Sequence, residues 1–379
     1  MMKRLICALS LLCSLALAGH AQDAIEIGGL KVVTATRAAV STTKPEFTSI
    51  TVAPGRGMEV LQITANFPGK GNINMLATPD LATAKKILDE KDDDFGNMGY
   101  RLGAAFLAPY PNRVRGTLSA DGKTLTTAWK GLPLTLPANN IGHLPGAERH
   151  AMHGLILKAK AEDVTVEKVD GGQEISGVIR AGDFGGHWPS KTQLVVIIRL
   201  TADAVDVRFE ASNIGKEAEP MALAWHPYFN LPSGNRAQAR VVIPATTTAE
   251  LDNYDNVFPT GKLLPIAGTK FDMNYVSGTE LQKNYYDDNW SHLVWEKKAA
   301  TVRVMDPAAH YGVLVEGLSP EIKTIQMFAP PQANFVVIEH QDNFADPFGK
   351  EWDGMDTGMI TLKPGETTRW HVRLKLYVP

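Results

Sequence analysis

Cysteine and long apolar segments are both scarce in this sequence of 379 residues. The only two cysteines, Cys7 and Cys13, lie within the first 21 residues. The rest of the chain therefore has no disulfide framework and no thiolate metal site. After residue 22 no stretch contains the roughly 18 consecutive apolar residues of a membrane-spanning helix. We expect a soluble domain whose hydrophobic core alone provides its stability.

An excess of positive charge is also absent, since 38 Lys and Arg residues face 41 Asp and Glu residues. This balance argues against nucleic acid as a partner. The sequence has no phosphate loop, no complete G-x-G-x-x-G, no H-E-x-x-H and no G-x-S-x-G. His150 and His153 have a spacing found in some metal sites, but only Glu148 is close enough in sequence to complete a ligand set. We therefore predict no metal site.

The N-terminus has the pattern of a secretory signal. Lys3 and Arg4 precede an apolar run over residues 5–18, and small residues precede a potential cleavage point after Ala21. We predict a signal peptide over residues 1–21 and a single exported domain over residues 22–379, which would reside in a periplasm or outside the cell. The alternative is a buried N-terminal helix. After cleavage we expect no membrane association.

Alternation with a period of two residues dominates the remaining sequence. Apolar and polar residues alternate strictly over residues 205–212 and again over residues 370–378, which predicts two half-buried strands. Shorter segments of this kind are separated by clusters of Gly, Pro, Asn and Asp. One short helix is predicted near Leu81–Leu88. These features favour an all-β fold, a large antiparallel β-sandwich.

Four segments combine polar side chains with aromatic residues: 108–114, 150–155, 223–231 and 334–341. In the first, an Asn-Arg pair beside a tyrosine has the donors to bind vicinal hydroxyls, although a surface turn has the same composition. In the second, a histidine precedes a glycine that permits close backbone approach. A histidine in the core or in a turn, with its hydrogen bonds satisfied, is the alternative.

The third and fourth segments suggest proton transfer. His226 lies among Trp, Tyr and Phe residues, where partial burial keeps a histidine close to neutral. Glu339 ends a strongly apolar strand, where desolvation would raise its pKa and make it a better base. An aromatic core cluster and a solvent-facing glutamate are the alternative interpretations of these two segments.

Taken together and in this order, the four segments resemble the aldose 1-epimerase family, the galactose mutarotases. The similarity extends over roughly residues 30–379, and its most specific part is His226-Pro-Tyr-Phe-Asn-Leu231. The resemblance implies a large β-sandwich and an enzyme of the isomerase class that interconverts the α and β anomers of a free monosaccharide. It implies no metal and no other cofactor, because ring opening requires only proton transfers.

The resemblance also implies roles for individual residues. His226 would be the general acid and Glu339 the general base. Arg113, with its neighbour Asn112, and His153 would bind sugar hydroxyls. The acidic residue that binds the sugar would be Asp287, with Asp288 as the alternative. The aromatic residues expected to cover the apolar face of the ring are Tyr110, Trp225 and Trp290.

Some positions differ from the family pattern, notably Leu155 and the residues around Asp346, and the segment 142–149 is unusual. We expect these differences to affect which sugar binds, because they lie around the expected pocket and leave the acid–base pair intact. Competing hypotheses are a non-catalytic carbohydrate-binding sandwich and a polysaccharide hydrolase or lyase on a related sandwich. A phosphosugar epimerase would need a basic rim, for which Arg113 and Arg115 are the candidates. The preferred aldose and the oligomeric state remain open.

Overall fold

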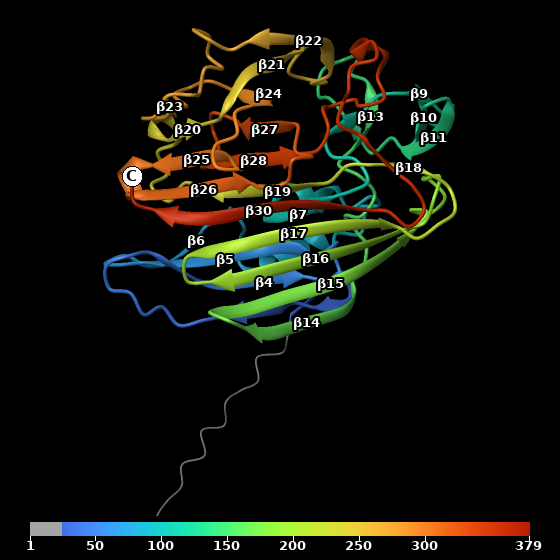
Figure 1. Ribbon diagram of the computed structural model, residues 1–379. Coiled ribbons are helices and arrows are strands. Elements are labelled where there is room, and N and C mark those ends of the chain that lie inside the picture. The colour runs from blue at the N-terminus through green and yellow to red at the C-terminus, as the bar shows by residue number, and fades with distance from the viewer. Residues whose placement is uncertain (1–24) are drawn as a thin grey trace, which may run out of the picture.

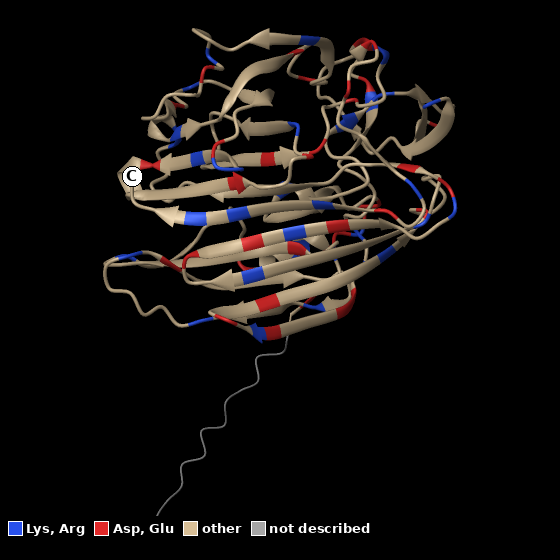
Figure 2. Ribbon diagram, in the orientation of Figure 1, with Lys and Arg blue, Asp and Glu red and all other residues tan. Residues whose placement is uncertain are grey.

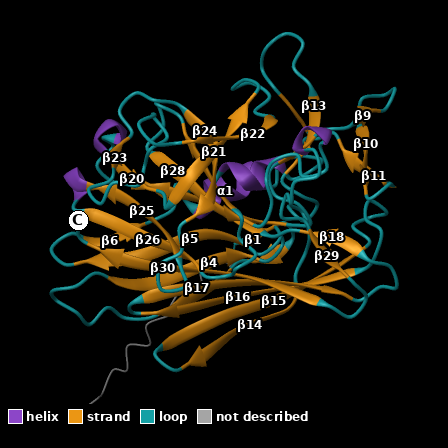
Figure 3. Ribbon diagram, turned by 45° about the horizontal axis from the view of Figure 1, so that its top comes forward, coloured by secondary structure: helices purple, strands orange, loops and turns teal. Residues whose placement is uncertain are grey.

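A computed structural model describes residues 25–379, in which strands predominate and helices are few and short (Figures 1 and 3). The predicted signal peptide over residues 1–21 lies outside the described residues. The one α-helix among these described residues, α1 (Leu81–Leu88), begins where predicted, and the side chain of Asp80 caps it by accepting a hydrogen bond from the backbone N–H of Thr83. The 3₁₀ helices are Asn97–Arg101, Arg236–Gln238, Pro307–Ala309 and Lys350–Trp352. Over residues 25–379, no helix has the length and apolar character needed to cross a membrane.

Two large antiparallel sheets form the body of the molecule. The eleven-stranded sheet has the order β22 (Pro259–Pro265), β21 (Ala245–Leu251), β24 (Tyr286–Leu293), β27 (Thr324–Ala329), β28 (Phe335–Gln341), β19 (Ala224–Asn230), β7 (Ala104–Leu107), β5 (Glu59–Phe67), β4 (Glu46–Ala53) and β3 (Val33–Thr36), with β6 (Gly71–Asn74) paired to β5. The nine-stranded sheet has the order β14 (Glu162–Val169), β15 (Gly172–Gly182), β16 (Thr192–Thr201), β17 (Ala204–Asn213), β30 (Thr367–Tyr377), β26 (Tyr311–Gly317), β25 (Ala300–Asp306), β20 (Arg240–Val242) and β23 (Thr279–Glu280).

Four small antiparallel sheets complete the strand inventory of the described residues. They are β1 (Glu26–Ile27) with β2 (Leu30–Lys31); β9 (Thr117–Leu118), β10 (Thr124–Trp129) and β11 (Leu132–Pro137); β8 (Arg113–Val114), β13 (Arg149–Met152) and β12 (Asn140–Ile141); and β18 (Glu219–Met221) with β29 (Ile360–Leu362). The sheet of β8, β12 and β13 carries Arg113 and leads directly into His153, two of the residues predicted to bind sugar hydroxyls.

The predicted alternation determines which side of each sheet is buried. In β17 and β30 the apolar residues are buried and the polar residues face outwards, in a register that pairs Phe209 with Trp370. Phe209 also packs against Phe106 of β7, in the other large sheet, with the ring centroids 5.1 Å apart. The core therefore lies between the two large sheets, which confirms the predicted β-sandwich.

The outer face of the nine-stranded sheet is charged but mixed in sign (Figure 2). Asp206 of β17 accepts a hydrogen bond from Arg373 of β30 at 2.9 Å, and Glu210 forms an ion pair with Arg369 at 3.3 Å. The two pairs differ in exposure, since the side chain of Asp206 is largely buried and that of Arg369 is largely exposed. An exposed pair such as Glu210–Arg369 adds little stability.

Candidate active site

A pocket of about 580 Å³ opens on the eleven-stranded sheet and collects most of the predicted polar residues. Its lining includes Arg113, His153, His226, Asp287 and Glu339, which come from five different segments of the chain. Two other hollows, of about 800 and 620 Å³, lie against the nine-stranded sheet and contain no comparable convergence of histidines and carboxylates. We therefore regard the 580 Å³ pocket as the candidate active site.

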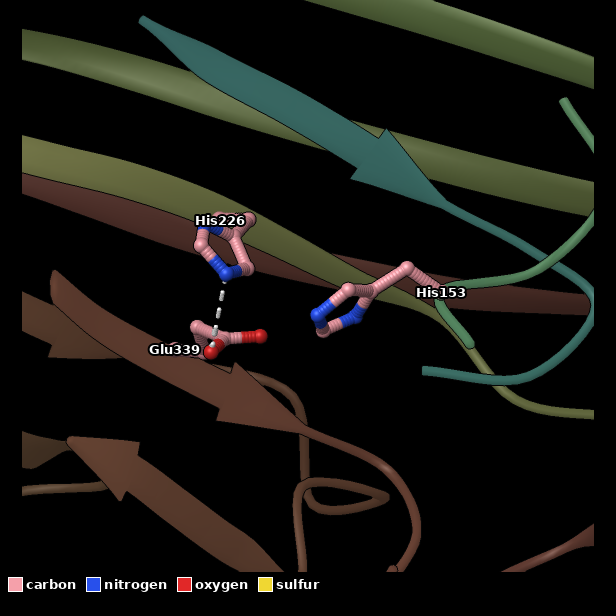
Figure 4. A group of neighbouring side chains, drawn as sticks. All are labelled: His153, His226 and Glu339. Carbon is pink, nitrogen blue, oxygen red and sulfur yellow. Dashed lines mark ion pairs between the residues drawn. The ribbon is translucent and has the colours of Figure 1, made fainter. Parts of the chain in front are cut away.

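His226 and Glu339 face each other across two neighbouring strands. The register of β19 and β28 pairs Ala224 with Gln341 and Tyr228 with Val337, which places His226 opposite Glu339. The Nε2 atom of His226 lies 3.4 Å from Oε1 of Glu339 (Figure 4). Because both side chains project from the middle of paired strands, their separation is fixed by the sheet rather than by a loop.

Burial determines the protonation of this pair. Desolvation lowers the pKa of His226 to about 3, and the positive charge of Arg113 contributes in the same direction. Desolvation raises the pKa of Glu339 to about 8, despite a hydrogen bond from Gln341 that favours the ionised form. The pair therefore shares one proton over a wide pH range, and in the free protein this proton resides on Glu339.

His153 completes a compact group with this pair. Its imidazole lies edge-on to that of His226, with the centroids 4.9 Å apart, and it also contacts the ring of Tyr100 at 4.7 Å. His153 adopts a left-handed backbone with φ of 59°, and Gly154 follows with φ of 77°. A Cβ at Gly154 would lie 2.2 Å from the carbonyl oxygen of Ala108, so only glycine fits there. The predicted close backbone approach at Gly154 is confirmed.

Arg113 is held in a buried polar network. Its guanidinium donates to Oδ2 of Asp287 at 3.0 Å and to Oδ1 of Asn112 at 3.1 Å. The other carboxylate oxygen of Asp287 accepts from Nε2 of Gln326 at 2.7 Å. The three predicted residues Asn112, Arg113 and Asp287 are thus brought together at the pocket wall. Their mutual hydrogen bonds fix the direction of each side chain before any ligand enters.

Two glutamines of this network were not predicted from the sequence. Gln326 of β27 pairs with Glu339 across the sheet, and its Oε1 accepts a hydrogen bond from Asn112 at 3.1 Å. Gln341 donates to Oε2 of Glu339 at 2.9 Å. Both side chains are almost fully buried. The sequence Thr-Ile-Gln326-Met-Phe could have indicated this role, because a buried amide inside an apolar strand needs hydrogen-bond partners.

The two candidate aspartates, Asp287 and Asp288, point in different directions. Asp287 points into the pocket, where it contacts Arg113 and Gln326. Asp288 does not line the pocket, and its Oδ1 accepts a hydrogen bond from the hydroxyl of Tyr254 at 2.8 Å. Because successive residues of a strand point to opposite faces, only one of them can face a ligand.

The aromatic prediction needs a correction. Tyr110, Trp225 and Trp290 do not line the pocket; all three are fully buried in the hydrophobic core between the sheets. For Trp225 the reason is strand alternation, since its neighbour His226 faces the pocket. The aromatic residues that do line the pocket are Tyr100, Tyr228, Tyr254, Tyr285 and Phe328.

Two further sequence features receive structural roles. The His150–His153 spacing does not form a ligand pair, because His150 is buried elsewhere and bonded to Asn140 and to the carbonyl oxygen of Glu148. Arg115 is engaged by Glu148 and Asp252 in ion pairs of 2.8 and 3.4 Å and does not line the pocket. It therefore provides no basic rim.

The three side chains in Figure 4 also satisfy a geometric condition for metal binding. His153, His226 and Glu339 each offer one ligand atom, and these atoms lie within 4.8 Å of one another. Two imidazoles and a carboxylate are a donor set that suits Zn²⁺. The arrangement can therefore exchange protons with a bound molecule or bind a divalent cation, but the same lone pairs cannot do both at once.

Comparison with known proteins agrees with the geometry. Residues 71–375 match the family model described as Aldose 1-epimerase. The galactose mutarotase of Homo sapiens is 26% identical over 187 residues, which are 48% of this chain and 48% of the human protein. The chain thus matches about half the length of this curated relative.

Solved structures show the same fold. A galactose mutarotase-like protein from Clostridium acetobutylicum has a TM-score of 0.68 at 19% identity, covering 92% of this chain and 98% of that protein. The galactose 1-epimerase of Lactobacillus acidophilus NCFM has a TM-score of 0.63 at 16% identity, covering 92% and 99%. At such identities the likeness concerns the fold alone.

Proposed function

The chain belongs to the aldose 1-epimerase family, and from this premise we propose that it is an exported enzyme that interconverts the α and β anomers of a free aldose. The observation that carries this proposal is the His226–Glu339 pair, 3.4 Å apart in a pocket that Arg113, His153 and Asp287 also line. The names of its relatives mention galactose, which makes galactose the first sugar to test.

The proposed reaction consists of two proton transfers and one bond rotation. The C1 hydroxyl gives its proton to one member of the pair while the ring oxygen receives a proton from the other. The C1–O5 bond breaks, and the aldehyde that results rotates about the C1–C2 bond. The same steps in reverse close the ring on either face of the carbonyl. No electrons are gained or lost, and the pair ends each cycle with the proton it began with.

We assign Glu339 as the base for the C1 hydroxyl and His226 as the acid for the ring oxygen. This assignment requires the shared proton to be on His226 in the reactive complex, although it resides on Glu339 in the free protein. The two forms contain the same number of protons, and a sugar oxygen near each group can stabilise the charged form. The requirement for one proton on the pair therefore holds whichever partner carries it.

The remaining pocket groups are proposed to bind hydroxyls. The Arg113–Asp287 pair offers donors and acceptors in a fixed relation, which is the arrangement needed to bind neighbouring hydroxyl groups. His153 lies beside the pair and is held neutral, because burial lowers its pKa well below the usual value. A neutral imidazole can donate to or accept from a hydroxyl without competing for the catalytic proton.

Two variants test this division of labour. His226→Ala should reduce turnover of α-galactose by about 10²–10⁴-fold, the usual contribution of one positioned acid, while circular dichroism and the melting temperature stay close to those of the parent. Arg113→Lys should mainly raise KM, because it weakens binding without removing the acid–base pair. Normal turnover in His226→Ala would remove that residue from the mechanism.

Export is part of the proposal and has its own test. The charged, apolar and small residues over positions 1–21 favour cleavage before Gln22. The intact mass of protein recovered from a periplasmic or culture fraction should correspond to a chain that starts close to Gln22. Recovery of the uncleaved chain in the cytoplasm would contradict export without affecting the proposed chemistry.

A further inference from the structure

A row of aromatic rings leads from the acid–base pair towards the protein surface. It starts at Tyr228, whose centroid is 5.1 Å from that of His226. The successive centroid distances are 4.8 Å for Tyr228–Phe335, 6.1 Å for Phe335–Phe328, 6.2 Å for Phe328–Tyr285 and 5.2 Å for Tyr285–Tyr254. Four of these rings line the pocket, and Phe335 lies between two of them. Three of the rings are carried by strands of the eleven-stranded sheet, β19, β28 and β27. Tyr285 and Tyr254 lie in loops beside it, Tyr285 immediately before β24 and Tyr254 after β21.

Beyond the buried Tyr228, the rings of the row lie outside the hydrophobic core. None of its five rings belongs to a buried apolar cluster of the described residues. Exposure increases along it, from 6% at Tyr228 to 41% at Tyr254, with the rings between them partly buried. Aromatic side chains that are only half covered lose part of the stabilisation that full burial would give. Their placement along one pocket wall therefore needs a reason other than packing.

Tyr254 is exposed and nevertheless held in place. Its hydroxyl donates to Oδ1 of Asp288 at 2.8 Å and accepts from Nζ of Lys270 at 2.8 Å. The same ammonium group lies 4.9 Å from the ring centroid. Asp288 is itself almost fully buried, so the tyrosine is tied to the rigid strand β24. A fixed, exposed ring presents an apolar surface to a ligand at little cost in conformational entropy.

The pocket is also larger than one pyranose requires. Its 580 Å³ lie within the range of about 300–1,000 Å³ typical of sites for drug-sized ligands. The catalytic pair and the hydroxyl-binding network occupy the buried end. The outer end is bounded by Tyr254 and Tyr285 and by the exposed Ile141. Sugar rings have one face of C–H groups, which pack well on aromatic rings.

We propose that the outer aromatic row binds a second sugar ring, so that the preferred substrate is the reducing end of an oligosaccharide rather than a monosaccharide. This inference rests on the proposed function, since only the reducing end has an anomeric centre to epimerise. The terminal ring would occupy the buried end at His226 and Glu339. The adjoining ring would lie against Tyr285 and Tyr254.

The test compares glucose with two of its reducing disaccharides, maltose and cellobiose, which differ in the configuration of the linkage. For at least one disaccharide the parent protein should have a lower KM than for glucose. Tyr254→Ala should raise that KM about tenfold, equivalent to roughly 1.4 kcal/mol, while the KM for glucose changes by less than about twofold. Tyr254→Leu, which keeps apolar bulk without a ring, should behave in the same way. Tyr275→Ala provides the matched control, because Tyr275 is an exposed tyrosine outside the pocket lining.

Calorimetric binding separates failure of this inference from failure of the proposed function. If no sugar is turned over but maltose or cellobiose still binds in a Tyr254-dependent manner, the second-sugar site stands and the epimerase proposal falls. If glucose is turned over but both disaccharides have an equal or higher KM, or Tyr254→Ala and Tyr275→Ala have the same effect, the second-sugar site is refuted while the epimerase proposal stands.

Discussion

Raising the pH above 8 should abolish the proposed activity by removing the single proton that the His226–Glu339 pair shares. Burial raises the pKa of Glu339 to about 8 and lowers that of His226 to about 3. Between these values the pair retains one proton, and above the upper one it has none to give to the ring oxygen. The value of kcat/KM should therefore be flat through neutral pH and fall on the alkaline side.

The size of the fall follows from the upper pKa. With a pKa of about 8, the fraction of active protein is about one tenth at pH 9 and about one hundredth at pH 10. The assay is polarimetry at several sugar concentrations, corrected at each pH for the uncatalysed reaction, which hydroxide accelerates. Circular dichroism at each pH shows whether the fold persists, so that loss of the protein is not mistaken for loss of the proton.

The variant Gln341→Met tests whether Glu339 is the group whose titration causes the alkaline fall. Gln341 donates a hydrogen bond to Oε2 of Glu339 at 2.9 Å, which favours the ionised carboxylate. Gln341→Met removes a bond to a charged group that is worth about 1.5–3 kcal/mol, or roughly one to two pKa units. The alkaline limb should therefore move to higher pH by about one unit or more. The value of kcat/KM at neutral pH should also fall, because Gln341 contacts Asn112 as well. The decisive quantity is the pH at which kcat/KM begins to decline.

The reasoning would be refuted by an alkaline limb that is absent up to pH 10 while the fold is retained. It would also be refuted by a limb at pH 8 that Gln341→Met leaves in place, since the titrating group would then not be Glu339.

Three further predictions concern the supports of the site. Asp287→Asn should raise KM about tenfold or more with a smaller change in kcat, because Arg113 loses its charged partner; an unchanged KM would exclude this pair from sugar binding. Gly154→Ala should lower the melting temperature by several degrees more than Gly146→Ala. Both glycines have positive φ, but only at Gly154 would the added Cβ have neighbouring atoms within 4 Å, the carbonyl oxygen of Ala108 among them. Equal shifts would mean that this close approach does not destabilise the fold. Dialysis against EDTA should leave mutarotation intact, whereas added Zn²⁺ should inhibit it. A bound cation would occupy the lone pairs of His153, His226 and Glu339 that the proton transfers need. Activity that is lost on chelation and restored by metal would contradict acid–base catalysis by the pair.

The fold was predictable because its signal repeats along the chain. The alternation over residues 205–212 and 370–378 determines which face of β17 and β30 is buried, and the structure pairs these two strands directly. The strand order could not be derived in this way. Alternation indicates that a strand has one buried face, but not which of many similar strands lies beside it.

The candidate site was predictable where a residue belongs to a contiguous motif. His226, His153 and Arg113 lie in short segments of unusual composition, and the structure brings them to one pocket with Glu339. Gln326 was missed because its importance comes from the strand pairing that places it opposite Glu339, which is a long-range property.

The prediction of the aromatic pocket residues was wrong for a different reason. Trp225 adjoins His226 in sequence, but adjacent residues of a strand point to opposite faces, so proximity in sequence argues against a shared pocket. The rings that do line the pocket, such as Tyr254 and Phe328, lie far apart in the chain and carry no local signal.

The central claim is that the His226–Glu339 pair catalyses anomer exchange, and polarimetry of freshly dissolved α-galactose and α-glucose tests it most directly. The account predicts that the protein accelerates mutarotation of at least one of these sugars. It also predicts that Glu339→Gln, which has nearly the same shape but cannot accept the proton, abolishes the acceleration while remaining folded. Acceleration that persists in folded Glu339→Gln would contradict the claim.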